Sequence, residues 1–283
     1  MLAAGIFLRE SVCSLALSRK RVIARRAVRD EGAALIGRLG ADGPYELLGV
    51  VGIYLADCRR HEVDVPEHVQ AVAGRLGLAL GVAPRMVFAH LSTHNSAGHT
   101  FTHLPDEHMF TAYNGLGVLA CQRAADALRR VAGVPIDGPL AAHLLDDARA
   151  ALDDVLQHSR TLARELDGDR FFYNVRPYFK PHVVCGTPST GAPTRVTTPR
   201  VCCTDRCSRE IDLALGLCDP RDPFYQRILA EKYPYVPPED QPRLRSIPAD
   251  LLSRIEATSP NVERFLAVCR PTLPPTRSTT TGW

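Results

Sequence analysis

Lysine is almost absent from this chain of 283 residues, which carries 31 arginines and only 3 lysines. Acidic residues nearly balance the basic ones, so the net charge is +3. A charge of that size gives no reason to expect a nucleic-acid or anionic-membrane partner. There is also no apolar run of membrane-spanning length and no secretory signal. These absences predict a cytoplasmic protein with reduced thiols.

Several metal-binding and cofactor-attachment motifs are missing as well. The nine cysteines form no CxxC pair of the kind that structural zinc sites use. There is no HExxH sequence and no CxxCH sequence, so nothing suggests a c-type haem linkage. Packed or loop thiols are therefore expected, although a thiolate such as Cys218 can also serve as an axial haem ligand.

Helical periodicity dominates what is present, and neither an internal repeat nor a convincing set of strands is found. The sequence therefore predicts an all-α protein with one helical domain over residues 45–268. Residues 1–44 are expected to form a helical extension and residues 269–283 a disordered tail. Helices are predicted over residues 10–39, 45–60, 66–80, 104–131, 140–166, 210–217, 223–233 and 251–268, and residues 187–207 are predicted to be an irregular loop.

Residues 88–108, FAHLSTHNSAGHTFTHLPDEH, hold five of the ten histidines. His90 and His94 are four positions apart, as are His99 and His103, and on a helix this spacing places two imidazoles on one face. The intervening Asn, Ser and Gly residues favour a loop instead. A mononuclear metal hydrolase built on residues 90–108 is one hypothesis, and loop histidines that bind backbone groups are the other.

In residues 169–182, DRFFYNVRPYFKPH, two phenylalanines and a tyrosine lead to Arg176. An arginine in apolar surroundings needs an anion, and its planar fork suits a carboxylate. That carboxylate belongs either to a structural Asp or Glu or to a ligand. The segment is therefore interpreted as a helix end packed on the core or as an aromatic wall beside a carboxylate clamp.

Two glycines, Gly115 and Gly117, lie inside the predicted helix 104–131. Each costs up to about 1 kcal/mol relative to Ala, unless a flat ligand or a packed helix must approach the backbone there. Two antiparallel helices, 104–131 and 140–166, would bring Asn114 towards Arg176. The expected walls of such a site are aromatic: Phe110, Tyr113, Phe171 and Phe172.

Four motifs in order resemble the histidine-ligated haem-dependent aromatic oxygenases, a superfamily that includes the tryptophan and indoleamine dioxygenases. They are FAHLSTHN, DEHMFTAYNG, FFYNVRPYF and EIDLALGLCDPRDPFYQRILAEKYPYVPPED. The similarity covers roughly residues 45–268 and is closest to the monodechloroaminopyrrolnitrin synthase-like branch. It rests on the order and spacing of the four motifs.

The resemblance implies a helical bundle of the indoleamine/tryptophan dioxygenase type that binds haem b. It implies an oxygenase or hydroxylase that uses O₂ or peroxide on an aromatic L-amino acid or a derived metabolite, in natural-product biosynthesis. It is also compatible with a homodimer. The matching positions give Arg176 as the carboxylate clamp, Phe171 as part of the substrate wall and Tyr113 or Asn114 as a distal-pocket residue, and His90 begins the HLST motif. The expected site therefore has Phe110 and Phe172 as further wall residues and Tyr113, Asn114 and His90 as candidate catalytic residues.

The chain departs from the dioxygenases in one respect. Their proximal haem histidine comes from the C-terminal helices, but no histidine follows His182 here. His182 is therefore the first candidate for the axial ligand, with His94 and the Cys218 thiolate as alternatives. A relative that has lost haem and binds only a small ligand is a further alternative.

Overall fold

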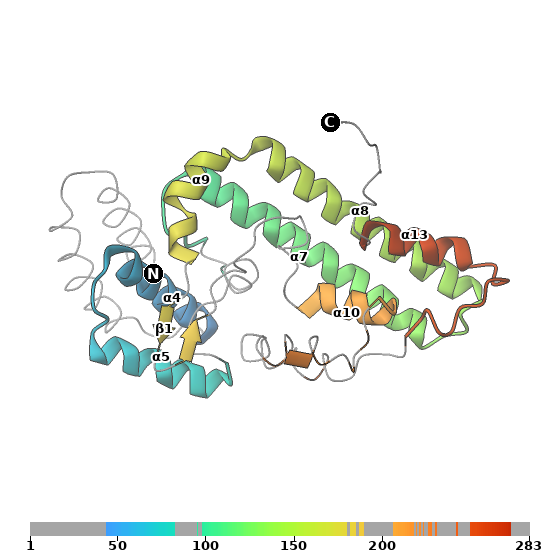
Figure 1. The fold of residues 1–283 in the computed structure, drawn as a ribbon, viewed down its shortest axis with the longest axis horizontal. Helices are drawn as coiled ribbons and strands as arrows, with labels where there is room; N and C mark the ends of the chain where they lie inside the picture. Colours follow the sequence, from blue (N-terminus) through green and yellow to red (C-terminus); the bar gives the residue numbers. More distant parts are fainter. Residues whose placement is uncertain are drawn as a thin grey trace.

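Two long helices that run antiparallel form the axis of the molecule, a computed structural model (Figure 1). They are α7 (Pro105–Ala132) and α8 (Pro139–Glu165). At one end, α10 (Arg206–Ala214) packs on α7, and α13 (Val262–Thr272) packs on α8. The structure describes residues 44–82, 95, 98–179, 182–184, 187–189, 206–217, 219, 221, 223, 226–227, 230, 242 and 250–272.

Short elements gather around the N-terminal end of α7. The first described helices are α4 (Pro44–His61) and α5 (Glu67–Leu80), which contact each other. After α8 the chain forms α9 (Gly168–Asn174) and the 3₁₀ helix η2 (Arg176–Phe179), and η2 packs on α4. The strands within the described residues are β1 (His182–Val184) and β2 (Thr187–Ser189), an antiparallel pair.

Helix limits follow from local chemistry. Pro105 and Pro139 begin α7 and α8, because the first turn of a helix does not need their missing N–H groups. Gly81 ends α5 with φ of 65°, a left-handed conformation that glycine adopts without a Cβ penalty. The predicted helices 45–60, 66–80, 104–131 and 140–166 are each confirmed to within two residues.

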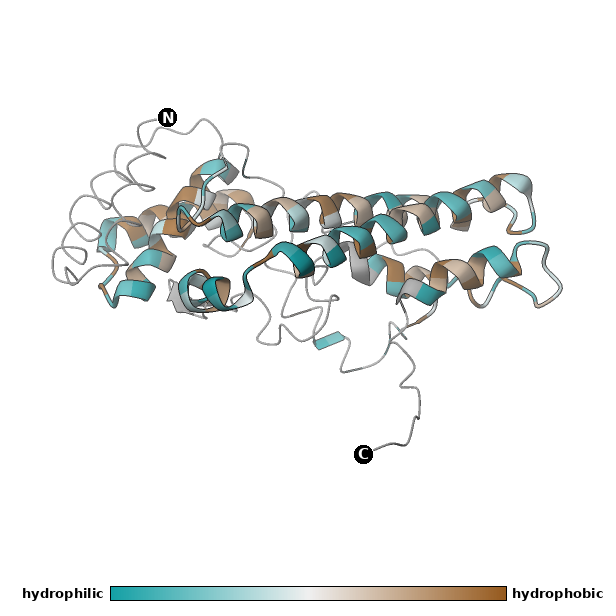
Figure 2. Cartoon of the chain, turned by 90° about the horizontal axis from the view of Figure 1, so that it is seen from above, coloured by the Kyte–Doolittle hydropathy of each residue, from teal (hydrophilic) through white to brown (hydrophobic). Residues whose placement is uncertain are grey.

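The larger hydrophobic core lies where α7, α8, α10 and α13 meet. The predicted apolar stripe of α8 supplies its centre, and Leu144, Leu145 and Ala148 are fully buried there. Leu128 of α7 and Phe265 of α13 pack into the same cluster. Hydrophilic and hydrophobic segments alternate along the two long helices, as expected of amphipathic helices (Figure 2).

The all-α prediction is confirmed, with four local differences. The helix predicted over residues 210–217 is α10, Arg206–Ala214, which begins inside the segment 187–207 that is predicted to be a loop. Residues 251–261 form turns rather than a helix, because Pro260 lacks an N–H group and disfavours helix before it; the helix begins only at Val262. That helix continues to Thr272, past the boundary predicted at residue 268. The segment Thr187–Ser189, predicted as loop, is a strand.

Some predictions lie outside the described residues: the extension 1–44 apart from Pro44, the helix 223–233 apart from isolated positions, and the tail after Thr272. In the part of the chain that is described, no helix is long and apolar enough to span a bilayer.

Candidate functional site

An aromatic cluster joins the N-terminal end of α7 to α9 and η2. The ring centroids of Phe110 and Phe171 are 4.4 Å apart, and those of Phe110 and Phe179 are 6.2 Å apart. Phe101 meets Phe179 edge-on at 5.2 Å and stacks on Tyr178 at 4.9 Å. We call these five residues the aromatic cluster. Tilted and edge-to-face pairs of this kind are favourable, so the cluster is a preformed apolar wall.

An ion pair between the buried Asp106 and the exposed Arg170 anchors α9 to the start of α7. The fully buried carboxylate of Asp106 accepts hydrogen bonds from the Arg170 guanidinium and, at 3.0 Å, from the Asp167 backbone N–H. The Asp167 side chain in turn caps α9 by accepting from the Arg170 backbone N–H at 2.9 Å. The Arg170 hydrogen bond holds the pKa of Asp106 below its usual value. The structural ion pair in this segment is thus made by Arg170.

Arg176 has a different environment. It is half-buried, and its guanidinium carbon lies 5.0 Å from the centroid of the Phe172 ring. Among the described residues it has no hydrogen bond or ion pair with a carboxylate. A structural Asp or Glu partner, one of the two interpretations of Arg176, is therefore absent from the described part of the chain. The planar fork remains available to a ligand carboxylate.

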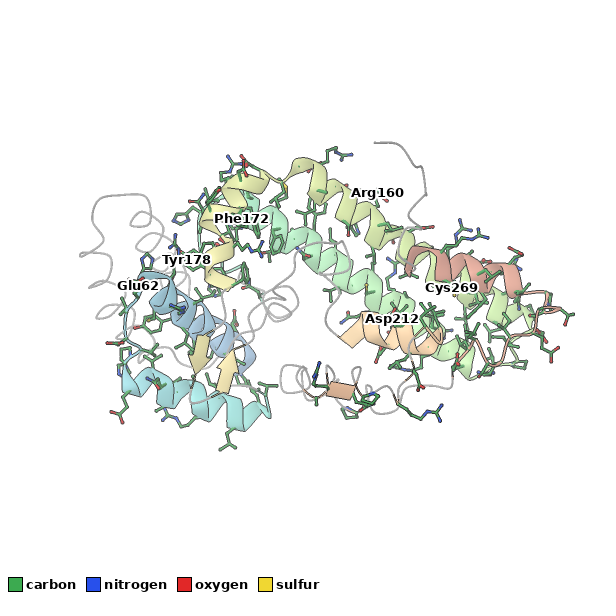
Figure 3. All side chains as sticks on the ribbon, viewed as in Figure 1. Glu62, Arg160, Phe172, Tyr178, Asp212 and Cys269 are labelled. Atoms are coloured by element: carbon green, nitrogen blue, oxygen red, sulfur yellow. The ribbon has the colours of Figure 1, made fainter. Side chains whose placement is uncertain are left out.

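The structure brings only some of the predicted aromatic residues together. Phe110 and Phe171 are in contact, but Phe172 is 48% exposed and lies under Arg176 instead (Figure 3). The Tyr113 ring lies 6.3 Å from His158 of α8, so it faces the neighbouring long helix. Because Phe171 and Phe172 are adjacent in the sequence, the sequence does not show which of the two joins the aromatic cluster and which is exposed.

Asn114 is 2% exposed and fixed in one orientation. Its Nδ2 donates to the Phe110 carbonyl at 2.5 Å, and since a carbonyl can only accept, Oδ1 must point the other way. In the described part of the chain, Oδ1 is buried without a donor, and the buried Thr111 hydroxyl one turn earlier has no hydrogen-bond partner either. Beside them, Gly117 is buried, yet a Cβ there would meet no atom within 4 Å. This face of α7 therefore has open space next to unsatisfied polar atoms.

The open space beside Gly117 leaves room for a group to approach the backbone of α7, and the flat ligand expected there stays a prediction. The side chains of the candidate axial ligands, in contrast, lie outside the described part. His182 is described only as a strand residue whose backbone pairs with Ser189. His90, His94 and Cys218 are not described. In the described ranges, no three His, Cys, Asp or Glu side chains are grouped so that they could hold a metal ion.

Two buried acids were not predicted as site residues. Asp57 of α4 is 1% exposed, and burial, followed by repulsion from Glu107, raises its pKa well above the usual value. Glu107 of α7 accepts hydrogen bonds from the N–H groups of Phe101 and Thr102, both at 2.6 Å. Burial nevertheless raises the pKa of Glu107 to about 7. Asp57 could have been noticed in the sequence, because it follows the apolar run GVVGIYLA.

Comparison with known families adds to this geometry. The family model described as monodechloroaminopyrrolnitrin synthase PrnB matches residues 16–270, which is most of the chain. The chain belongs to the PrnB family. This confirms the branch inferred from the four ordered motifs, and PrnB is a family of oxygenase enzymes. A search of curated proteins finds no match.

Proposed function

We propose that this member of the PrnB family is a haem-dependent oxygenase or hydroxylase. Its substrate would be an aromatic L-amino acid or a metabolite derived from one, in natural-product biosynthesis. One observation carries the proposal: Arg176 has no carboxylate partner among the described residues and belongs to η2, the helix that supplies Phe179 to the aromatic cluster. An arginine and an aromatic wall are complementary to a carboxylate and an aromatic ring.

Each predicted site residue receives a role in this proposal. Arg176 binds the substrate carboxylate, Phe110 and Phe171 contact the ring, and Phe172 supports the guanidinium. Asn114 accepts a hydrogen bond from a ligand N–H or O–H group, and Tyr113 and His90 remain further candidate catalytic residues. His182 or His94 would ligate haem b, and the Gly117 face of α7 would lie against it.

When bound, haem would supply the O₂ or peroxide chemistry. The chain's own contribution is to orient the substrate and keep water from the reacting ring. The cytoplasmic location, the homodimer and the domain boundary at residue 44 stay predictions.

The clamp is tested by measuring ligand affinity for the wild type, Arg176→Lys and Arg176→Ala. L-Tryptophan and tryptamine, which lacks the carboxylate, serve as probes. A charge-assisted pair is worth about 1.5–3 kcal/mol, so Arg176→Ala should weaken L-tryptophan binding roughly 10- to 100-fold. Lysine should rescue little because it lacks the planar fork. Tryptamine should bind all variants alike.

Arg160→Ala is the matched control, since Arg160 is exposed on α8 (Figure 3). It should bind both probes as the wild type does. The proposal fails if folded Arg176→Ala binds L-tryptophan normally. It also fails if circular dichroism shows that Arg176→Ala unfolds while Arg160→Ala does not, because Arg176 would then have a structural partner.

A further inference from the structure

Asp57 is the buried charge-bearing group that the proposed function leaves unexplained. Its side chain is 1% exposed, and among the described residues neither carboxylate oxygen has a hydrogen-bond partner. Burying a polar group without a hydrogen bond costs roughly 1–3 kcal/mol in mutational studies, and transfer to an apolar solvent gives still larger values. Native interiors satisfy most such groups, so an unsatisfied carboxyl indicates a functional demand.

The surroundings of Asp57 restrict what could satisfy it. Asp57 shares a face of α4 with Ile53 and Ala56, and these pack against Phe101 and Tyr178 of the aromatic cluster. The nearest charged group that affects it, Glu107, is itself an acid. Glu107 cannot donate to Asp57 while ionised, and its own oxygens already accept from the backbone of residues 101 and 102.

A buried carboxyl on a helix that packs against aromatic residues, with a second acid acting on its pKa, is complementary to a cationic nitrogen. Once Asp57 is ionised, its carboxylate provides negative potential, and the faces of aromatic rings attract a cation. An ammonium group also carries up to three N–H donors for the unsatisfied oxygens of Asp57. An anion or a neutral apolar group would leave the carboxyl unsatisfied.

We propose that Asp57 binds the amino group of the substrate, so that the protein selects aromatic compounds with both a free amino group and a carboxylate. This inference rests on the proposed function, in which Arg176 binds the carboxylate. Asp57 and Arg176 come from α4 and η2, two elements that pack on each other. Neither residue has an ion-pair partner among the described residues.

Proton release gives the proposal a distinctive signature. Burial raises the pKa of Asp57, which favours the protonated carboxyl in the ligand-free protein. A bound ammonium group stabilises the ionised form, so that proton passes to the solvent as the ligand binds. Calorimetric titration in buffers of different ionisation enthalpy measures such release directly.

The experiment titrates the full chain with L-tryptophan and with indole-3-propionate, which lacks only the amino group. The wild type should bind L-tryptophan at least about 10-fold more tightly and release close to one proton per ligand, since a charge-assisted hydrogen bond is worth more than about 1.4 kcal/mol. Asp57→Asn should abolish both the preference and the proton release. Asp64→Asn, which removes an exposed carboxyl between α4 and α5, is the control and should retain both.

The outcomes distinguish failure of this inference from failure of the proposed function. If Asp57→Asn keeps the preference for L-tryptophan, or if the wild type releases no proton, Asp57 does not bind the amino group. If L-tryptophan is preferred over tryptamine through Arg176 but not over indole-3-propionate, the proposed function stands and only this inference falls. If neither L-tryptophan nor indole-3-propionate binds the wild type, both fall. Proton release by the wild type keeps the test decisive even if Asp57→Asn does not fold.

Discussion

The two ends of the molecule treat their polar groups differently. At the end formed by α8, α10 and α13, Arg254 donates to the carbonyls of Ala132 and Val134 at 2.6 and 3.1 Å. Arg129 pairs with the buried Glu210 at 2.6 Å. At the other end, around α4, α9 and η2, Asp57 and Arg176 have no such partner among the described residues. Native interiors pair most buried polar groups, so the unpaired Asp57 and Arg176 are what the proposed ligand site would account for.

The largest expected effect is a loss of stability in the core at the first end, with ligand binding unchanged. Leu145→Ala removes a fully buried side chain from the larger core and should lower the free energy of unfolding by about 2–5 kcal/mol. The ratio of affinities for L-tryptophan and tryptamine should stay unchanged. Chemical denaturation and titration of the folded variant measure the two quantities. A changed ratio would show that the two ends are not independent.

A second comparison is between two arginines of the same segment. Arg170→Ala leaves the buried Asp106 without its guanidinium and should lower the melting temperature by roughly a few degrees, whereas Arg176→Ala should not. Because the pKa of Asp106 is lowered in the folded state, this stabilisation is present at neutral pH and lost as the pH falls below about 4. Melting curves at pH 7 and pH 3.5 test both statements. Equal melting temperatures for the two variants at pH 7 would contradict them.

Asp57 should show the opposite dependence on pH in the ligand-free protein. Its folded pKa is raised, so the folded state holds a proton that the unfolded state releases above about pH 4. Stability is therefore lost as the pH rises, by up to ~1.4 kcal/mol per pH unit, and Asp57→Asn removes this loss. Denaturation of both proteins between pH 4 and pH 8 should show a growing advantage for the variant. A constant difference would exclude the raised pKa.

The smallest effect on stability is expected at Gly117. Its added methyl group meets no atom within 4 Å, and alanine favours the helix by up to about 1 kcal/mol, so Gly117→Ala should fold as well as the wild type or slightly better. If a flat ligand lies against this face, the methyl group should still weaken its binding. Thermal unfolding and haem titration separate the two effects. Unchanged haem affinity would place the cofactor elsewhere.

Most helices of the fold could be predicted from the sequence because the residues at which they begin and end depend on local chemistry. Pro105 and Pro139 start helices and Gly81 ends one, and each acts only on residues within one helical turn of it. The helix predicted over residues 251–268 is wrong in its first half, also for a local reason, because Pro260 disfavours helix in the residues before it. The short β1–β2 pair was missed because three-residue strands carry too little periodicity to be recognised.

The candidate site was predictable only in part. The aromatic–arginine segment was correctly placed beside α7, but Arg170 and Arg176 look alike in the sequence. Which of them pairs with Asp106 depends on a contact between residues 64 positions apart. Asp57 was missed for a related reason, because a carboxyl in an amphipathic helix is expected on the exposed face. The apolar run GVVGIYLA before it is the available sequence signal, and tertiary packing shows that it is buried.

The visible absorption spectrum of the full chain, produced with a haem precursor, tests the central claim most directly. The account predicts a Soret band with bound iron, and a shift of that band when L-tryptophan is added to the wild type but not to Arg176→Ala. Bound zinc without a Soret band would instead support the hydrolase hypothesis based on residues 90–108. Neither iron nor zinc would leave a small-ligand binder, and either result would contradict a haem oxygenase.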